Sequence, residues 1–267
     1  MNAEDSLREG DLQGALDALQ AQVRSDPSNS KYRVFLFQLL CVAGQWDRAL
    51  TQLNVAGDLD AGTLAMVHTY RDLLQCEALR AAVFKGQRSP LVFGEPEEWI
   101  ALILEALRIE AGGQSARAQQ LRDQAFEVAP TTAGSLNDEA FDWIADADSR
   151  IGPFLEAVIY GRYYWIPFHR IAQIKCDEPE DLRDFVWAPA QFQWENGGEA
   201  VGFIPTRYAG TESEADDLLR LARKTEWQES GDGVYAGLGQ RMIATDSNEY
   251  PLLDVRTVSL SGADDAD

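Results

Sequence analysis

One constant spacing between small residues limits how the N-terminal half of this chain can fold. Gly10, Ala15 and Leu19 recur further along the chain as Gly44, Ala49 and Leu53, and the distance between the two copies is the same for all three residues. Glycine permits a tight turn between two helices, because it adopts positive φ angles at little cost. Alanine lets two helix axes come close, and a leucine one turn later fills the space between them. The spacing therefore predicts antiparallel helical hairpins that stack on one another.

A third copy of the pattern lies further along the chain, as Gly113, Ala118, Ala125 and Pro130. It departs from the first two at Arg122, which stands where they have leucine. The offset from Gly10 to Gly44 equals the period of the tetratricopeptide repeat. Residues 63–85 have apolar side chains at helical spacing but lack the small residues, which indicates a degenerate repeat. We therefore predict a tetratricopeptide-like helical repeat domain over residues 1–130.

Beyond residue 130 the composition favours strands. Residues 191–195 and 200–204 alternate polar and apolar side chains around a turn, residues 196–198, that is rich in glycine, which is a hairpin pattern. The other expected elements are a short helix over 152–160, a strand over 163–166, a capped helix that begins at 213–216, and strands near 239–245 and 252–258. The expected fold class is α+β, with the helical repeats followed by a smaller strand-rich domain, mixed β with short helices, over 131–260. Residues 261–267 are expected to form an acidic disordered tail.

The charge of the chain excludes two classes of partner. It carries 44 acidic and 23 basic side chains, for a formal charge of −21. Such a charge repels the phosphates of nucleic acids and of anionic membranes, so neither is an expected partner. It would attract a partner with a basic face, and simple solubility is the other reason for such a surface. The N-terminus lacks the regions of a signal peptide and no apolar run could span a bilayer, which predicts a cytoplasmic protein.

Signatures of enzyme chemistry are missing from the sequence. His68 and His169 are the two histidines, and neither has a second histidine at the spacing of a metal site. There is no phosphate-binding GxxxxGKS/T loop, no GxSxG motif and no GxGxxG motif after a strand. We expect no metal, no cofactor and no catalytic residue, and hence a protein that binds its ligand without transforming it.

An acidic cluster lies between the two predicted domains: Asp142, Trp143, Asp146, Asp148 and Arg150. One interpretation is that the aspartates cap turns and pair with Arg150, so that these five residues form an inter-domain joint. The alternative is an enzyme in which Asp146 and Asp148 act as an acid–base pair or hold a cation. The sequence favours the joint, because the pattern lacks the later glycine and glutamate of an EF-hand loop.

Six segments carry a resemblance to a known family: Arg33–Leu40, Gly44–Ala49, Phe93–Trp99, Asp142–Arg150, Gly161–Pro167 and Ile204–Tyr208. They resemble the ImpE/TagJ family of accessory proteins of bacterial type VI secretion systems. The resemblance runs nearly end to end and is more specific than the repeat alone. It implies a non-catalytic cytoplasmic adaptor that binds the N-terminal amphipathic helix of the small contractile-sheath subunit. It also implies a link to the ClpV ATPase, which disassembles the contracted sheath.

A helical-hairpin array can present a groove into which an amphipathic helix lays its apolar face. Aromatic side chains are typical anchors of such a groove. The candidate peptide-binding residues are Tyr32, Phe35, Gln38 and Trp46. The sequence leaves two alternatives open: these side chains pack between repeats, or the strand-rich domain forms the groove. A third hypothesis is a chaperone-like scaffold whose acidic surface holds basic clients.

Overall fold

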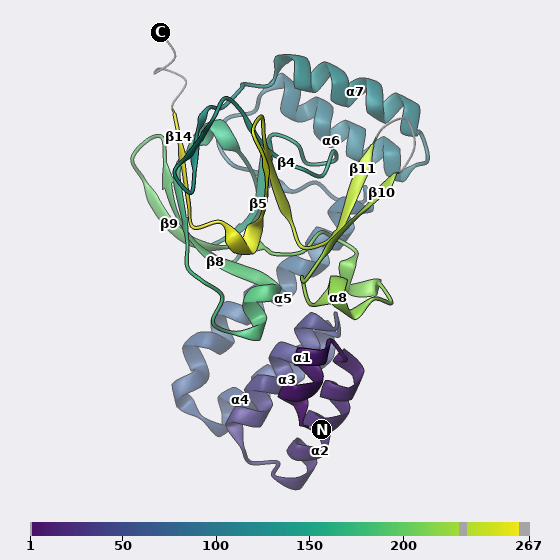
Figure 1. Ribbon diagram of the computed structural model, residues 1–267, viewed down its shortest axis with the longest axis vertical. Coiled ribbons are helices and arrows are strands. Elements are labelled where there is room, and N and C mark those ends of the chain that lie inside the picture. The colour runs from purple at the N-terminus through teal and green to yellow at the C-terminus, as the bar shows by residue number, and fades with distance from the viewer. Residues whose placement is uncertain (1, 230–233, 262–267) are drawn as a thin grey trace.

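The computed structural model describes residues 2–229 and 234–261 of the 267-residue chain. The described helices are α1 (Ala3–Glu9), α2 (Leu12–Ser25), α3 (Ser30–Val42), α4 (Trp46–Leu59), α5 (Leu64–Phe84), α6 (Glu98–Ala111), α7 (Ser115–Val128) and α8 (Asp217–Arg220). Helices α1–α4 lie at one end of the molecule and the strands at the other, where α6 and α7 also pack (Figure 1). The expected acidic tail lies outside the described residues except for Ser261. In the described part of the chain, no helix combines the length and apolar character needed to cross a membrane.

The expected helical hairpins are confirmed. The turn glycines have positive φ angles of +82°, +68° and +82°, and each joins two helices: Gly10, Gly44 and Gly113. The alanines that follow in the second helix of each pair are fully buried: Ala15, Ala49 and Ala118. The small residues of the repeat therefore stand where two helices meet or where the chain turns between them.

The turn glycines differ in their surroundings, which gives a matched test of their role. A Cβ atom added to Gly44 would lie 2.5 Å from the Cβ of Glu212, whereas one added to Gly113 would meet nothing within 4 Å. Both alanine variants place a side chain on a left-handed backbone, which lowers stability by about 1–2 kcal/mol, but only Gly44→Ala adds a steric clash. We expect Gly44→Ala to lower the free energy of unfolding by about 2–4 kcal/mol and Gly113→Ala by about 1 kcal/mol, measured by urea titration. Equal losses would contradict this account.

Residues 63–85 do not form a hairpin repeat, so the prediction of a degenerate repeat was wrong although its helical pattern was right. A 3₁₀ turn, η1 (Ala61–Thr63), leads into α5, which runs unbroken for 21 residues. No glycine or proline interrupts that segment, so nothing in the sequence ends the helix. Helix α5 touches both parts of the molecule, because the ring of Tyr70 packs 5.6 Å from that of Phe37 in α3 and 5.8 Å from that of Phe203 in a strand.

The strands of the described residues form three sheets. They are β1 (Leu91–Val92), β2 (Gly134–Leu136), β3 (Glu139–Phe141), β4 (Ile144–Asp146), β5 (Phe154–Ile159), β6 (Arg162–Pro167), β7 (Ile171–Cys176), β8 (Trp187–Trp194), β9 (Glu199–Pro205), β10 (Thr225–Glu229), β11 (Tyr235–Gly239), β12 (Met242–Thr245), β13 (Glu249–Pro251) and β14 (Thr257–Leu260). The largest sheet has the order β1-β6-β5-β9-β8-β7-β14-β2-β3, and the smaller ones are β10-β11 and β13-β12-β4. In the largest sheet only β1 is parallel to its neighbour, β6.

Several expected elements of the strand-rich region are confirmed. Strands β8 and β9 form the predicted hairpin, and β6 contains the predicted strand over 163–166. The predicted strand near 239–245 is β12, whereas the one near 252–258 begins later, as β14, after a 3₁₀ turn. The expected capped helix is the short α8, and its cap is Asp216, whose carboxylate accepts the N–H of Leu218 at 2.7 Å.

The helix expected over 152–160 is a strand, and that prediction was wrong. Strand β5 occupies Phe154–Ile159, and all six of its residues are buried. A strand buried on both faces has an unbroken apolar run, which over six residues does not differ from the pattern of a buried helix. Gly161, expected to end that helix, instead follows Tyr160 in a two-residue hairpin turn with φ angles of +72° and +50°.

One apolar cluster joins the helices to the largest sheet. Its buried members include Leu12, Phe37, Leu74 and Trp187, and a second cluster lies among the strands. Because side chains from both sides of residue 130 share the first cluster, residue 130 marks a change of secondary structure within a continuous core. The separate folding of residues 1–130 and 131–260 stays a prediction.

Candidate partner-binding site

An open groove runs beside α3 at the repeat end of the molecule. Its volume is about 360 Å³, and its lining includes Glu4, Lys31, Val34, Phe35, Gln38, Asp60 and Asp181. Four of these residues come from α3, where side chains three and four positions apart lie on one face. Asp181 comes from the strand-rich half, from the residue that caps η3 (Leu182–Phe185). The groove therefore combines one helix face with a contribution from the second half of the chain.

The four candidate peptide-binding residues are only partly brought together. Phe35 and Gln38 line the groove. The ring of Trp46 instead packs with its centroid 5.9 Å from that of Trp187 in β8. Tyr32 lies partly buried against the main apolar cluster, outside the lining. Peptide binding by these residues stays a prediction, and the geometry favours Phe35 and Gln38 among them.

Carboxylates outnumber cations around this groove. The lining includes three carboxylates, those of Glu4, Asp60 and Asp181, and one cation, Lys31. The amide Nε2 of Gln38 lies 3.5 Å from Oδ1 of Asp181, so the buried glutamine connects α3 to the strand-rich half. A helix that binds here would be favoured by basic residues beside its apolar face.

A buried ionic network connects α5 to the strands. Arg80 of α5 donates to both carboxylate oxygens of Glu156 in β5, at 2.7 and 3.0 Å. A second guanidinium, that of Arg241, is paired with both Glu156 and Asp146 of β4. All four side chains are buried. Charges removed from water are tolerated only when they are paired and hydrogen-bonded, so the position of each group depends on the other three.

The acidic cluster is divided between this buried region and the surface. Asp148 is fully buried and accepts the Nη2–H of Arg150 at 2.5 Å. The guanidinium of Arg150 lies 5.0 Å from the ring centre of Phe84 in α5. Asp142 and Trp143 are exposed instead. Of the cluster, Arg150 contacts α5, and the buried Asp148 holds Arg150 in that position. A joint formed by all five residues stays a prediction.

The carboxyl groups of the network have opposite pKa shifts. Burial opposes the ionised form of Glu156, but Arg80 and Arg241 outweigh it and hold the pKa at about 2, below its ordinary value of 4.5. Burial raises the pKa of Asp146 from 3.8 to about 7, because the attraction of Arg241 does not outweigh burial and because the carboxylates of Asp148 and Glu156 add to the rise. Asp146 is therefore the group of this network that titrates near neutral pH.

These shifts predict how stability depends on pH. Glu156 has a lowered pKa in the folded state, so its contribution is present above about pH 4.5 and is lost as the pH falls toward 2. Asp146 has a raised pKa, so its contribution is present below about pH 3.8 and is lost as the pH rises through 7. We expect the free energy of unfolding of the unmodified protein to fall between pH 5 and 7.5, and the Asp146→Asn variant to lose that slope. Urea titration at several pH values measures it, and an unchanged slope in the variant would contradict the assignment.

Sequence reasoning missed the buried cations, including Arg207. The guanidinium of Arg207 is buried and donates to the carbonyl oxygens of Val42 at 2.7 Å and Cys41 at 3.3 Å, at the end of α3. Burial lowers its pKa to about 10. The sequence did contain one indication of a buried cation, which is a single acidic residue in an apolar run, Glu156 in β5. Charged side chains are rarely buried without a partner of opposite charge. That signal indicates a partner without identifying it.

Stacked helical hairpins with an open groove, joined to a large sheet through α5 and its buried ion pair, define a repeat-containing scaffold for protein interactions. Two family models match the chain, a tetratricopeptide repeat over residues 6–70 and the ImpE protein over residues 138–259. The type VI secretion system accessory component TagJ of Pseudomonas aeruginosa is 50% identical over 264 residues, which cover 99% of this chain and 92% of that protein. The chain belongs to the ImpE/TagJ family, which confirms the resemblance found in the sequence.

The fold is shared with a solved structure. The crystal structure of protein VPA1032 from Vibrio parahaemolyticus matches this chain with a TM-score of 0.87 at 25% sequence identity. The match covers 97% of each chain, so it includes both the repeat helices and the strand-rich half.

Proposed function

We propose that this protein is a cytoplasmic, non-catalytic accessory adaptor of a bacterial type VI secretion system. It binds the N-terminal amphipathic helix of the small contractile-sheath subunit and is linked to sheath disassembly by the ClpV ATPase. The observation that carries this proposal is the 50% identity, over 99% of the chain, to the Pseudomonas aeruginosa accessory component TagJ. The family resemblance implies the identity of the partner, and the groove beside α3 is a surface with the apolar and acidic side chains that suit a basic amphipathic helix.

The groove beside α3 offers what an amphipathic helix needs. Val34 and Phe35 supply apolar surface, and the Gln38 amide can donate and accept hydrogen bonds. The carboxylates of Glu4 and Asp60 would attract basic residues at the edge of such a helix. At about 360 Å³ the groove holds a few side chains. The anchoring side chains of the partner would therefore dominate the affinity.

Deletion of the N-terminal helix from the sheath subunit should abolish its capture by this protein. The measurement is a pull-down of the full-length and truncated sheath subunit with the full chain. Phe35→Ala should weaken capture of the full-length subunit, with a roughly tenfold increase in Kd, because it removes the main apolar contact of the groove. Circular dichroism of the variant checks that the fold is intact.

The matched control is Tyr160→Ala, because Tyr160 is 80% exposed and does not line the groove. It should bind the sheath subunit like the unmodified protein. Unchanged capture of the truncated subunit would refute recognition of its helix. Capture that depends on the helix but is unaffected by Phe35→Ala would refute the groove as the site.

The alternative is an enzyme with an acidic site around Asp146 and Asp148. The raised pKa of Asp146, about 7, is the observation in its favour. Against it, Asp146 is paired with Arg241 and Asp148 with Arg150, so neither carboxylate is open to a substrate. Among residues 2–229 and 234–261, no three histidine, cysteine, aspartate or glutamate side chains are grouped as around a metal ion. A turnover abolished by both Asp146→Ala and Asp148→Ala would favour the enzyme.

A further inference from the structure

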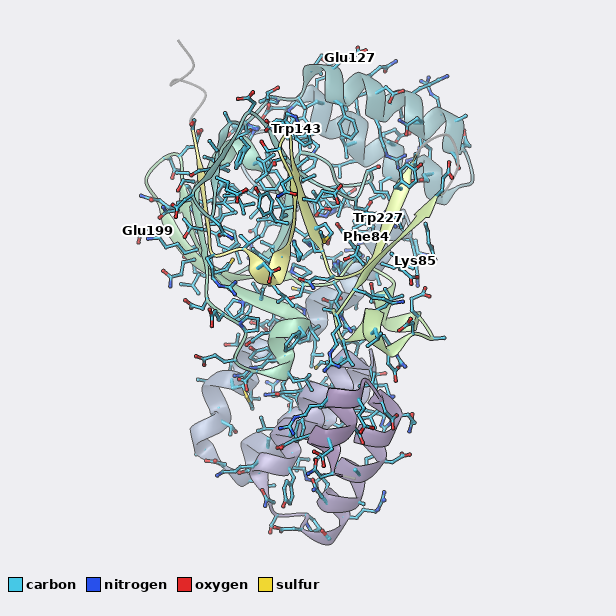
Figure 2. The ribbon with its side chains drawn as sticks, viewed as in Figure 1. Phe84, Lys85, Glu127, Trp143, Glu199 and Trp227 are labelled. Carbon is cyan, nitrogen blue, oxygen red and sulfur yellow. The ribbon has the colours of Figure 1, made fainter. Side chains whose placement is uncertain are left out.

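A second pocket lies at the opposite end of the molecule from α3, where the end of α7 meets β4. We call it the Trp143 pocket, and its lining includes Phe126, Pro130, Trp143, Ile144, Pro153 and Ala244. Its volume is about 440 Å³. Apolar side chains dominate this lining, in contrast to the groove beside α3. Figure 2 shows Trp143 at the end of the molecule that carries α7, far from the repeat helices α1–α4.

Two large aromatic side chains remain exposed at this pocket. Trp143 is 40% exposed and Phe126 is 41% exposed. Trp143 is held in place, because the carboxylate of Asp246 accepts the backbone N–H of Asp142 at 2.7 Å and that of Trp143 at 3.4 Å. Phe126 lies directly over Gly152, where any added Cβ would come within 2.7 Å of its ring. Half-exposed aromatic residues on a fixed backbone around an apolar pocket are typical of protein-binding hot spots.

The charges around the pocket have one sign. The exposed charged residues next to the lining in sequence, or paired with it across strands, are acidic: Glu127 follows Phe126, Asp142 precedes Trp143, and Asp246 and Glu249 lie beside Ala244. The cations of the same segments are committed elsewhere, because Arg150 pairs with Asp148, and Arg241 with Asp146. Backbone N–H groups lower the pKa of Asp246, so that carboxylate stays charged at neutral pH. A second copy of this chain, with its charge of −21, would therefore be repelled.

We infer that the Trp143 pocket binds a basic amphipathic segment of a protein partner, which places an apolar side chain between Phe126 and Trp143 and lysines or arginines against the acidic rim. Apolar contact gives such a complex its affinity, and the acidic rim excludes acidic segments and speeds association. The proposal goes beyond binding of the sheath helix, because α3, which lines the groove, and α7, which lines the Trp143 pocket, lie at opposite ends of the molecule (Figure 1). An adaptor with two such surfaces can hold two partners at once.

The test uses the full chain and a synthetic amphipathic helical peptide with leucines on one face and lysines on the other. The reporter is the indole N–H signal of Trp143 in the ¹⁵N-labelled protein, assigned with Trp143→Phe. The lysine peptide should shift this signal. In a Phe35→Ala background, which weakens binding to the groove beside α3, Trp143→Ala should raise the Kd of the peptide, measured by fluorescence anisotropy, at least roughly tenfold. A matched peptide with glutamate in place of every lysine should not bind.

Two control variants separate this site from the other surfaces. Tyr160→Ala removes an exposed aromatic side chain elsewhere and should leave the Kd unchanged. Phe35→Ala alters the groove beside α3 and should leave the shift of the Trp143 signal unchanged, whatever its effect on the sheath subunit. The proposal is overturned by a Trp143 signal that does not move at saturating lysine peptide, by equal Kd values with and without Trp143→Ala in the Phe35→Ala background, or by equal binding of the glutamate peptide.

Discussion

Glu156→Ala should lower the free energy of unfolding by about 3–5 kcal/mol and the melting temperature by roughly 10 °C. Glu156 is fully buried and accepts hydrogen bonds from Arg80, Arg241 and Tyr163. Its removal would leave two guanidinium groups in the core with one fewer counter-charge, and an unpaired buried charge is among the most destabilising changes known. Differential scanning calorimetry of the full chain measures the effect.

The matched control is Glu199→Ala on β9, a neighbour of β5 in the same sheet. Glu199 is exposed (Figure 2), so its removal should change the free energy of unfolding by less than about 0.5 kcal/mol. A third variant, Glu156→Gln, keeps the shape and one acceptor oxygen and should be less destabilising than Glu156→Ala. Similar melting temperatures for Glu156→Ala and Glu199→Ala would show that the network contributes little to stability.

The repeat helices could be predicted from the sequence because their signal is local. Gly10 and Gly44 need the positive φ angles that the turns impose, and Ala15 and Ala49 are buried where helices cross. Such requirements act on single residues at fixed spacing, so they remain visible in one sequence. Helix α5 departed from the repeat because the same local rules contain no turn signal between its ends.

The buried network could not be predicted because its partners are far apart in the sequence. Arg80 and Glu156 are 76 residues apart, and Arg241 and Asp146 are 95 residues apart. A single sequence shows that Glu156 is a charge in an apolar run, but not which cation compensates it. The same limit applied to β5 itself, since a short run of five apolar residues and one glutamate fits a buried helix or a buried strand equally well until its neighbours are known.

The candidate site was predicted in part for the same reason. Phe35 and Gln38 are three residues apart on one helix face, so their shared position along the groove followed from helical spacing. The contact of Trp46 could not be predicted, because its partner, Trp187, belongs to a strand in the second half of the chain. Asp181, which completes the groove, also comes from the second half. The repeat pattern therefore could not predict the positions of residues that contact the second half of the chain.

Two arginines of the second half contact the repeats at equivalent positions. Arg207 donates to the carbonyl oxygens of Cys41 and Val42, and Arg223 donates to those of Leu7 and Arg8. The second pair of carbonyls precedes the first by one period of the repeat, the same offset that separates Gly10 from Gly44. In both cases the guanidinium donates to two carbonyl groups at the end of the first helix of a hairpin, where the dipole favours a cation. One carbonyl of each pair, that of Leu7 or Cys41, also accepts the N–H of the turn glycine. The second half therefore recognises the same feature of two consecutive repeats.

Arg207→Ala should lower the free energy of unfolding by about 2–4 kcal/mol. Arg207 is buried, and its guanidinium also donates to the carbonyl oxygen of Arg220, so its loss leaves acceptors of both halves without a donor. Arg223→Ala removes the equivalent contact at an exposed site, where water replaces the lost donor, and should cost less than about 1 kcal/mol. Urea titration of the two variants measures the difference. If both variants lost the same stability, burial of the Arg207 contact would not be what holds the second half to the repeats.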